Sequence, residues 1–126
     1  MHQIDFPDCT FDCCRIMTTF QHVTDPKKAL DEIFRIVKIG GRIVAWEPNR
    51  RSFVLSSSFP ECADKLLKNW ANGILNPDMG LQLQELFERK NANNIKVHII
   101  PRISHTLSEN VVPVVIFPVT AYTFCN

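Results

Sequence analysis

Residues 11–49 carry the pattern that most constrains the fold. An apolar run over Phe11–Met17 comes first, then a helical pattern over 25–38, then Gly40-Gly41, then a second apolar run over Arg42–Trp46. Two short apolar strands separated by an amphipathic helix are typical of a β-α-β unit, the repeat of a doubly wound sheet. The sequence therefore predicts an α/β fold in which the strands near 11–17 and 42–47 are parallel and adjacent.

The helix between these strands has its own start and stop signals. Asp25 is placed to cap the first turn, and Pro26 fits that turn because its missing N–H has no helical partner there. One face of the helix is apolar and the other is charged, as expected for a helix packed on a sheet. Gly40-Gly41 is expected to end the helix and turn the chain into the second strand.

Two more helices and two β segments are predicted downstream. A helix at about 61–71 has an apolar face made of Ala63, Leu66, Leu67, Trp70 and Ala71. Another begins near Asp78, with an apolar face made of Met79, Leu83, Leu86 and Phe87. Residues 95–100 are expected to join the same sheet. The segment 111–124 has β composition, and its prolines, Pro113 and Pro118, predict an edge strand or a broken one.

Length and charge exclude several classes of protein. A chain of 126 residues suits one domain with its own core. Its net charge of +1 gives no basis for electrostatic capture of nucleic acid or of an anionic membrane. No apolar run reaches the roughly 20 residues that a membrane helix needs, so a cytoplasmic protein is expected. The five cysteines lack C-x-x-C spacing, which predicts reduced thiols and no metal site.

Short motifs occur in a distinctive order along the chain. They read DFPD at 5–8, FD at 11–12, FQHV at 20–23, DP at 25–26, RIVKIGG at 35–41 and WEP at 46–48. This ordered set resembles the class I S-adenosyl-L-methionine (SAM)-dependent methyltransferases, and it is similar to the type 11 group. The segment NPDMGL at 76–81, with the helix and strand after it, resembles the distal half of that domain.

The resemblance implies a three-layer, Rossmann-like sheet, with residues 1–126 as a partial methyltransferase domain. The family holds SAM on a glycine-rich loop after its first strand, and no G-x-G-x-G occurs in this sequence. We therefore expect an incomplete domain, in which the N-terminal strands and the glycine-rich loop are missing.

Cofactor residues follow from the resemblance by position. The backbone of Met1 would meet the adenine edge of SAM. Carbonyl oxygens at the end of the first strand would face its ammonium group, at Ile16, Met17 and Thr18. Phe20 and Gln21 would also lie near the cofactor. Core packing is the alternative for Phe20.

Three side chains are candidates for handling a methyl acceptor. His22 matches the family's usual histidine, and an imidazole that titrates near neutrality can act as a general base. A buried, hydrogen-bonded support is the alternative for His22. Glu47 and Asn49 follow the second strand, where open α/β sheets bind their ligands, so we expect them to contact the acceptor. A solvated loop end is the alternative for both.

Together these features favour a SAM-dependent methyltransferase that acts on a small molecule. The alternative is a non-catalytic, methyltransferase-like remnant that acts through protein–protein contacts, and an unrelated α/β binding domain is a third. Because the strand at 11–17 would lack a neighbour on one side, self-association through that edge is expected. The acceptor itself is not identified, since methyl transfer depends mainly on alignment of the reactants.

Overall fold

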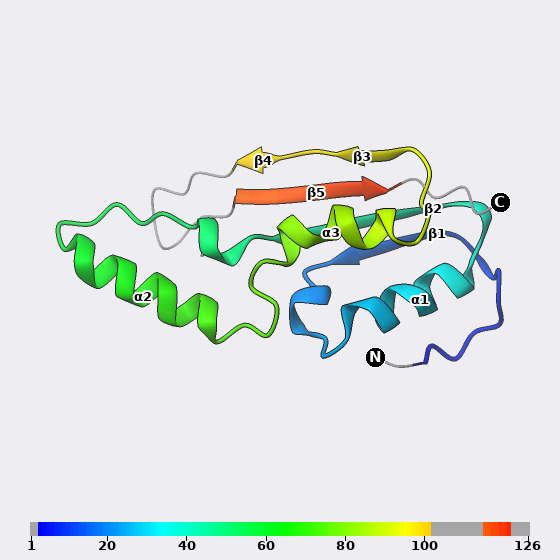
Figure 1. Cartoon of the computed structure of the whole chain (residues 1–126), viewed down its shortest axis with the longest axis horizontal. Coiled ribbons are helices and arrows are strands. Elements are labelled where there is room, and N and C mark those ends of the chain that lie inside the picture. Colours follow the sequence, from blue (N-terminus) through cyan, green and yellow to red (C-terminus); the bar gives the residue numbers. More distant parts are fainter. Residues whose placement is uncertain (1–2, 102–114, 122–126) are drawn as a thin grey trace.

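The computed structural model describes residues 3–101 and 115–121, the second segment by its backbone. Their strands form one sheet in the order β1-β2-β5-β3, with β4 also paired to β5 (Figure 1). The strands are β1 (Phe11–Met17), β2 (Val37–Pro48), β3 (Ile95–Val97), β4 (Ile100–Pro101) and β5 (Val115–Ala121). β1 and β2 are parallel, and β5 is antiparallel to its neighbours. The predicted α/β fold with parallel first strands is confirmed.

Three helices and two 3₁₀ turns lie between the strands in the part of the chain that the structure describes. The helices are α1 (Pro26–Ile36), α2 (Pro60–Asn72) and α3 (Met79–Glu88), and the 3₁₀ turns are η1 (Phe20–His22) and η2 (Arg50–Ser52). The predicted cap of α1 is confirmed, because the Asp25 carboxylate accepts a hydrogen bond from the Lys28 backbone N–H at 3.0 Å.

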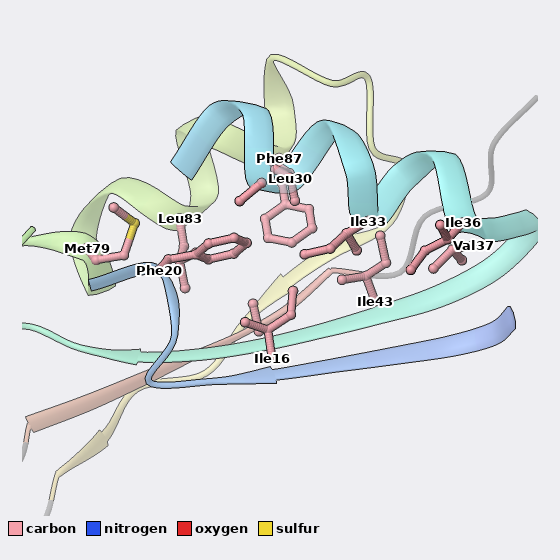
Figure 2. Packing of buried hydrophobic residues seen from close by; sticks show 12 residues of the cluster. Ile16, Phe20, Leu30, Ile33, Ile36, Val37, Ile43, Met79, Leu83 and Phe87 are labelled. Carbon is pink, nitrogen blue, oxygen red and sulfur yellow. The ribbon is translucent and has the colours of Figure 1, made fainter. Parts of the chain in front are cut away.

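The main core lies between the sheet and two helices on the same face, α1 and α3 (Figure 2). Its buried side chains come from β1, η1, α1, β2 and α3, among them Ile16, Phe20, Leu30, Ile33, Ile43, Met79, Leu83 and Phe87. On β1, Cys14 and Ile16 face these helices, whereas Cys13 and Arg15 are exposed on the other face. The described residues thus supply two layers of the expected three-layer fold.

The end of α1 differs from the sequence expectation. The helix ends at Ile36 because the segment before β1 takes its last carbonyls: Cys9 N–H donates to Arg35 at 2.9 Å, and Thr10 N–H donates to Ile36 at 2.8 Å. Gly40-Gly41 therefore lies inside β2. The pairing register with β1 shifts across it, and Gly40 has a φ of 78°. The glycines form an irregularity within a strand, so the prediction that they end the helix was wrong.

The tail strand also differs. β5 lies between β2 and β3, so the edge position predicted from Pro118 was wrong, and Pro113 lies outside the described residues. A strand residue directs its N–H to one side only, so Pro118 removes a donor on one side of β5 and leaves the pairing on the other side intact. The predicted strand at 95–100 does join the sheet, as the two short strands β3 and β4.

Helix α2 lies beyond the carboxyl ends of β1 and β2 (Figure 1). Its span agrees with the prediction, but its apolar face does not meet the sheet: Leu66 is 60% exposed and Trp70 is 36% exposed, and the buried residues of α2 are Ala63 and Ala71. Within the described residues, the sheet ends before it reaches α2 (Figure 1), so the larger side chains of α2 have no strand to pack against. No helix in the described part of the chain is long and apolar enough to cross a membrane.

Gly41 provides a test of the irregularity in β2. A Cβ at this position would lie 2.5 Å from Val37 Cγ1, 2.8 Å from the Lys38 carbonyl and 3.0 Å from the Asp12 carbonyl. Gly41→Ala should therefore lower the free energy of unfolding by about 1–3 kcal/mol in urea denaturation. Gly73→Ala is the control, because its Cβ would meet only ordinary contacts. Equal stability of the two variants would contradict the close packing of Gly41 within β2.

Candidate functional site

The carboxyl ends of β1 and β2 lie side by side and form the candidate site. Met17 pairs with Trp46 as the last rung of the two strands, and the Thr18 N–H donates to the Trp46 carbonyl at 2.8 Å. The chain then turns back sharply at Thr18, whose φ is 49°. This is the edge of an open α/β sheet at which ligands bind.

A buried carboxylate fixes the loop after β1. Glu47 is fully buried, and it accepts hydrogen bonds from three successive backbone N–H groups: Thr19 at 2.6 Å, Phe20 at 2.7 Å and Gln21 at 3.4 Å. Burial raises the pKa of Glu47, and the backbone N–H groups and the charge of Arg50 partly oppose that rise. The side chain thus caps the free N–H groups at the start of η1.

Carbonyl oxygens gather at the turn that Glu47 fixes. The Met17 carbonyl accepts from the Thr19 hydroxyl at 2.9 Å, and the Thr18 carbonyl accepts from Gln21 Nε2 at 3.2 Å. Each carbonyl has two lone pairs, so each retains acceptor capacity after one bond. A rim of this kind suits a cationic ammonium group.

Asn76, in the loop before α3, supports the turn from the other side. Its Nδ2 donates to the Phe20 carbonyl at 2.9 Å and to the Val23 carbonyl at 2.7 Å. Its backbone N–H donates to the Gln21 carbonyl at 3.0 Å. Residues more than fifty positions downstream therefore hold η1 in place.

The residues after β2 are held as firmly as those after β1. Asn49 is buried, and its Oδ1 accepts from the Arg51 N–H at 3.1 Å, which caps η2. Arg50 Nε donates to Gln21 Oε1 at 2.8 Å, and Arg51 Nε pairs with Asp78 at 3.1 Å. Burial lowers the pKa of Arg50, and the charge of Glu47 opposes this.

The candidate residues named from the sequence lie close together at the strand ends, but they differ in how far they are buried. Met17 and Thr18 lie at the surface of the turn, whereas Ile16, Phe20 and Gln21 are buried beneath it. Met1 lies outside the described residues. His22 is exposed, which excludes the buried support considered as its alternative. Glu47 and Asn49 are buried and bonded to backbone N–H groups, so neither is the solvated loop end considered for it.

Sequence reasoning missed the arginines and the asparagine that complete this region. Arg50 and Arg51 follow the polar end of β2 directly. Two adjacent cations after the carboxyl end of a strand could have indicated site residues. Asn76 gave no comparable signal, because its two carbonyl partners are distant in sequence. No group of three metal-ligating side chains occurs among the residues that the structure describes.

Glu47 gives this region a pH dependence of known sign. Its raised pKa means that the folded state binds the proton more tightly than the unfolded state, whose pKa is near 4.5. The stability that this adds is complete below that pH and is lost as pH rises through the folded pKa. The free energy of unfolding of the wild type minus that of Glu47→Gln should therefore fall from pH 4.5 upward in urea titrations.

The control for this measurement is Glu85→Gln, on the exposed side of α3. Its stability relative to the wild type should show no comparable fall over the same pH range. If the stability of the wild type relative to Glu47→Gln grew with pH, the raised pKa of Glu47 would be contradicted.

Comparison with known proteins shows similarity to methyltransferases over part of the chain. The model of a methyltransferase domain matches residues 1–45. The ubiquinone/menaquinone biosynthesis C-methyltransferase of Marinomonas sp. (strain MWYL1) is 38% identical over 65 residues, which cover 51% of this chain and 26% of that protein. The enzyme of the same name from Cronobacter sakazakii is 44% identical over 50 residues, 40% of this chain and 20% of that protein. The matches span about a quarter or less of these relatives.

Solved structures share the fold over nearly the whole chain. A SAM-dependent methyltransferase from Thermotoga maritima, described as a possible histamine N-methyltransferase, has a TM-score of 0.68 and 21% identity, covering 97% of this chain and 60% of that one. A putative methyltransferase of Haloferax volcanii, solved with its Trm112 activator, has a TM-score of 0.60 and 15% identity, covering 97% and 58%. The chain is thus similar to class I SAM-dependent methyltransferases in residues 1–45, in the stretches shared with these enzymes and in its fold.

Proposed function

We propose that this chain contributes to SAM-dependent methyl transfer to a small-molecule acceptor. The observation that carries the proposal is the rim of carbonyl oxygens at the end of β1, held by the buried Glu47 carboxylate. The ammonium group of SAM requires acceptors of this kind. Met17 and Thr18 supply them through the backbone, so the fit does not depend on side-chain identity.

Each residue has a distinct part in this proposal. SAM, when bound, supplies a methyl group that is already activated on a sulfonium. Glu47 is a positioning residue, because it is fully buried and holds the Thr19–Gln21 backbone. Gln21 fixes the Thr18 carbonyl, and Phe20 anchors the loop in the core. Catalysis then consists mainly of alignment of acceptor and methyl group, for which the exposed His22 is a candidate base.

These residues account for one part of a cofactor site. The sequence contains no G-x-G-x-G, the loop that the family uses for the rest of SAM. Loss of one hydrogen bond to a charged group costs roughly 1.5–3 kcal/mol, and each 1.4 kcal/mol is about tenfold in affinity. We therefore expect binding by this chain alone to be weak, which favours a covalent capture assay.

Photoaffinity labelling tests the location of the cofactor. A photoreactive SAM analogue should label peptides that contain residues 16–22 or 46–50, because the carbonyl rim lies at those strand ends. Excess S-adenosylhomocysteine should remove that label, since it competes for the same rim. Label found only in residues 60–101 and unaffected by the competitor would overturn the proposal.

The free edge of β1 favours a second candidate function. Within the described residues β1 pairs only with β2, and its other edge has no strand beside it. Unpaired N–H and C=O groups along such an edge are a template for another strand. The second candidate is therefore a non-catalytic methyltransferase-like module that acts through contacts at this edge, and a second copy of the chain is the occupant that we propose.

A proline on β1 tests the edge. The Thr18 N–H points toward β2, and successive N–H groups alternate sides, so the N–H of Arg15 points away from β2. Arg15→Pro should remove an edge donor and reduce self-association in sedimentation velocity, while the β1–β2 pairing survives. Arg15→Gln, which keeps the N–H, should behave as the wild type. A wild type that stays monomeric at all concentrations would exclude this interface.

A further inference from the structure

A pocket of about 240 Å³ lies between η2 and α2, directly after the end of β2. Both elements lie beyond the carboxyl ends of the parallel strands (Figure 1). Its lining comes from the two elements in similar measure: Arg50, Arg51, Phe53, Asp64, Leu67, Lys68 and Ala71. None of these residues belongs to the carbonyl rim at the end of β1.

The charges around the pocket are mainly positive. Arg50, Arg51 and Lys68 line it against one carboxylate, Asp64. Arg51 is fixed by Asp78 at 3.1 Å and by Asn72 at 3.2 Å. Lys68 and Asp64 are exposed residues on α2 with no ion pair among the described residues. The lysine is therefore the cation most available to a ligand.

The opposite wall is apolar and aromatic. Phe53 is buried, packs against Trp46 and Leu67, and meets the Trp70 ring edge-on with ring centres 4.8 Å apart. The Arg50 guanidinium lies over both rings, with its carbon 4.7 Å from the centre of Trp70 and 5.7 Å from that of Phe53. These contacts fix the Arg50 guanidinium against the Phe53 and Trp70 rings.

Arg50 also joins the pocket to the proposed cofactor loop. Its Nε donates to Gln21 Oε1 at 2.8 Å, and Gln21 donates in turn to the Thr18 carbonyl at 3.2 Å. Its backbone N–H donates to the Pro77 carbonyl at 2.7 Å, in the loop before α3. Two side chains, Arg50 and Gln21, thus connect the pocket to the carbonyl rim.

We propose that this pocket binds the methyl acceptor, and that the acceptor is a small acid with one negative charge and an apolar or aromatic body. Positive charge from Lys68 and the arginines binds the acid, and Phe53 and Leu67 contact the body. Asp64 disfavours a second negative charge on the ligand. This inference rests on the proposed function, because it assigns the second substrate of the same reaction.

Three probes that share a phenyl ring and differ mainly in charge test the pocket without SAM. Phenylacetate, phenylacetamide and phenethylamine share one ring and carry a negative charge, no charge and a positive charge. In saturation-transfer NMR on the wild-type chain, phenylacetate should bind most tightly and phenethylamine least. Equal binding of phenylacetate and phenylacetamide would overturn the proposal.

Charge variants on α2 locate the bound probe. Lys68→Gln should weaken phenylacetate binding by roughly threefold to tenfold, and Asp64→Asn should strengthen it, because the two charges act on the anion with opposite sign. Lys65→Gln is the matched control, since Lys65 is an exposed lysine of α2 outside the pocket. The same loss for Lys65→Gln and Lys68→Gln would show general charge attraction and would refute the site.

The two proposals fail in different measurements. Anion binding is measured in the absence of cofactor, whereas the cofactor site is located by photolabelling. Suppose that S-adenosylhomocysteine removes the photolabel from the strand ends, but phenylacetate does not bind selectively. That result would overturn the acceptor pocket alone. The opposite result is that phenylacetate binds with the expected variant pattern, but the competitor removes no photolabel from the strand ends. That result would overturn the methyltransferase proposal, and the acceptor role with it.

Discussion

The candidate site depends on one buried carboxylate. Glu47 is the penultimate residue of β2, and its two oxygens accept hydrogen bonds from the backbone N–H groups that begin η1. One side chain therefore links the carboxyl ends of two parallel strands. Removing a carboxylate from water is costly unless its hydrogen bonds are supplied by the protein. Here they are supplied by backbone N–H groups whose positions fix the turn at Thr18. The carbonyl rim and the attachment of Arg50 both follow from that turn.

Sequence reasoning succeeded where the signal is local. Asp25 and Pro26 define the start of α1 through capping chemistry, and the apolar runs of β1 and β2 require burial in a sheet. The parallel pairing follows from the helix that connects the strands. The candidate residues at the two strand ends could be named for the same reason, since position in the sheet selects them before any side-chain chemistry is considered.

The rest depends on contacts between distant segments. The end of α1 is set by Cys9 and Thr10, which take its last carbonyls, and local sequence favoured the later glycines instead. The periodicity of α2 predicted a buried face, although the sheet does not extend beneath it. Asn76 and Arg50 act through partners that are 29 or more positions away. A single sequence gives no indication of such pairings, because they exist only once the sheet has assembled.

Helix α2 gives the molecule two regions that can change independently. The core between the sheet and the helices α1 and α3 contains no side chain from α2, which buries little beyond two alanines. Two of the pocket residues on α2, Asp64 and Lys68, are exposed, so their replacement leaves that core intact. Mutations here are largely free of the stability cost that usually accompanies a change of function. The exposed side chains at this end of the sheet can therefore diverge among related proteins while the fold stays the same.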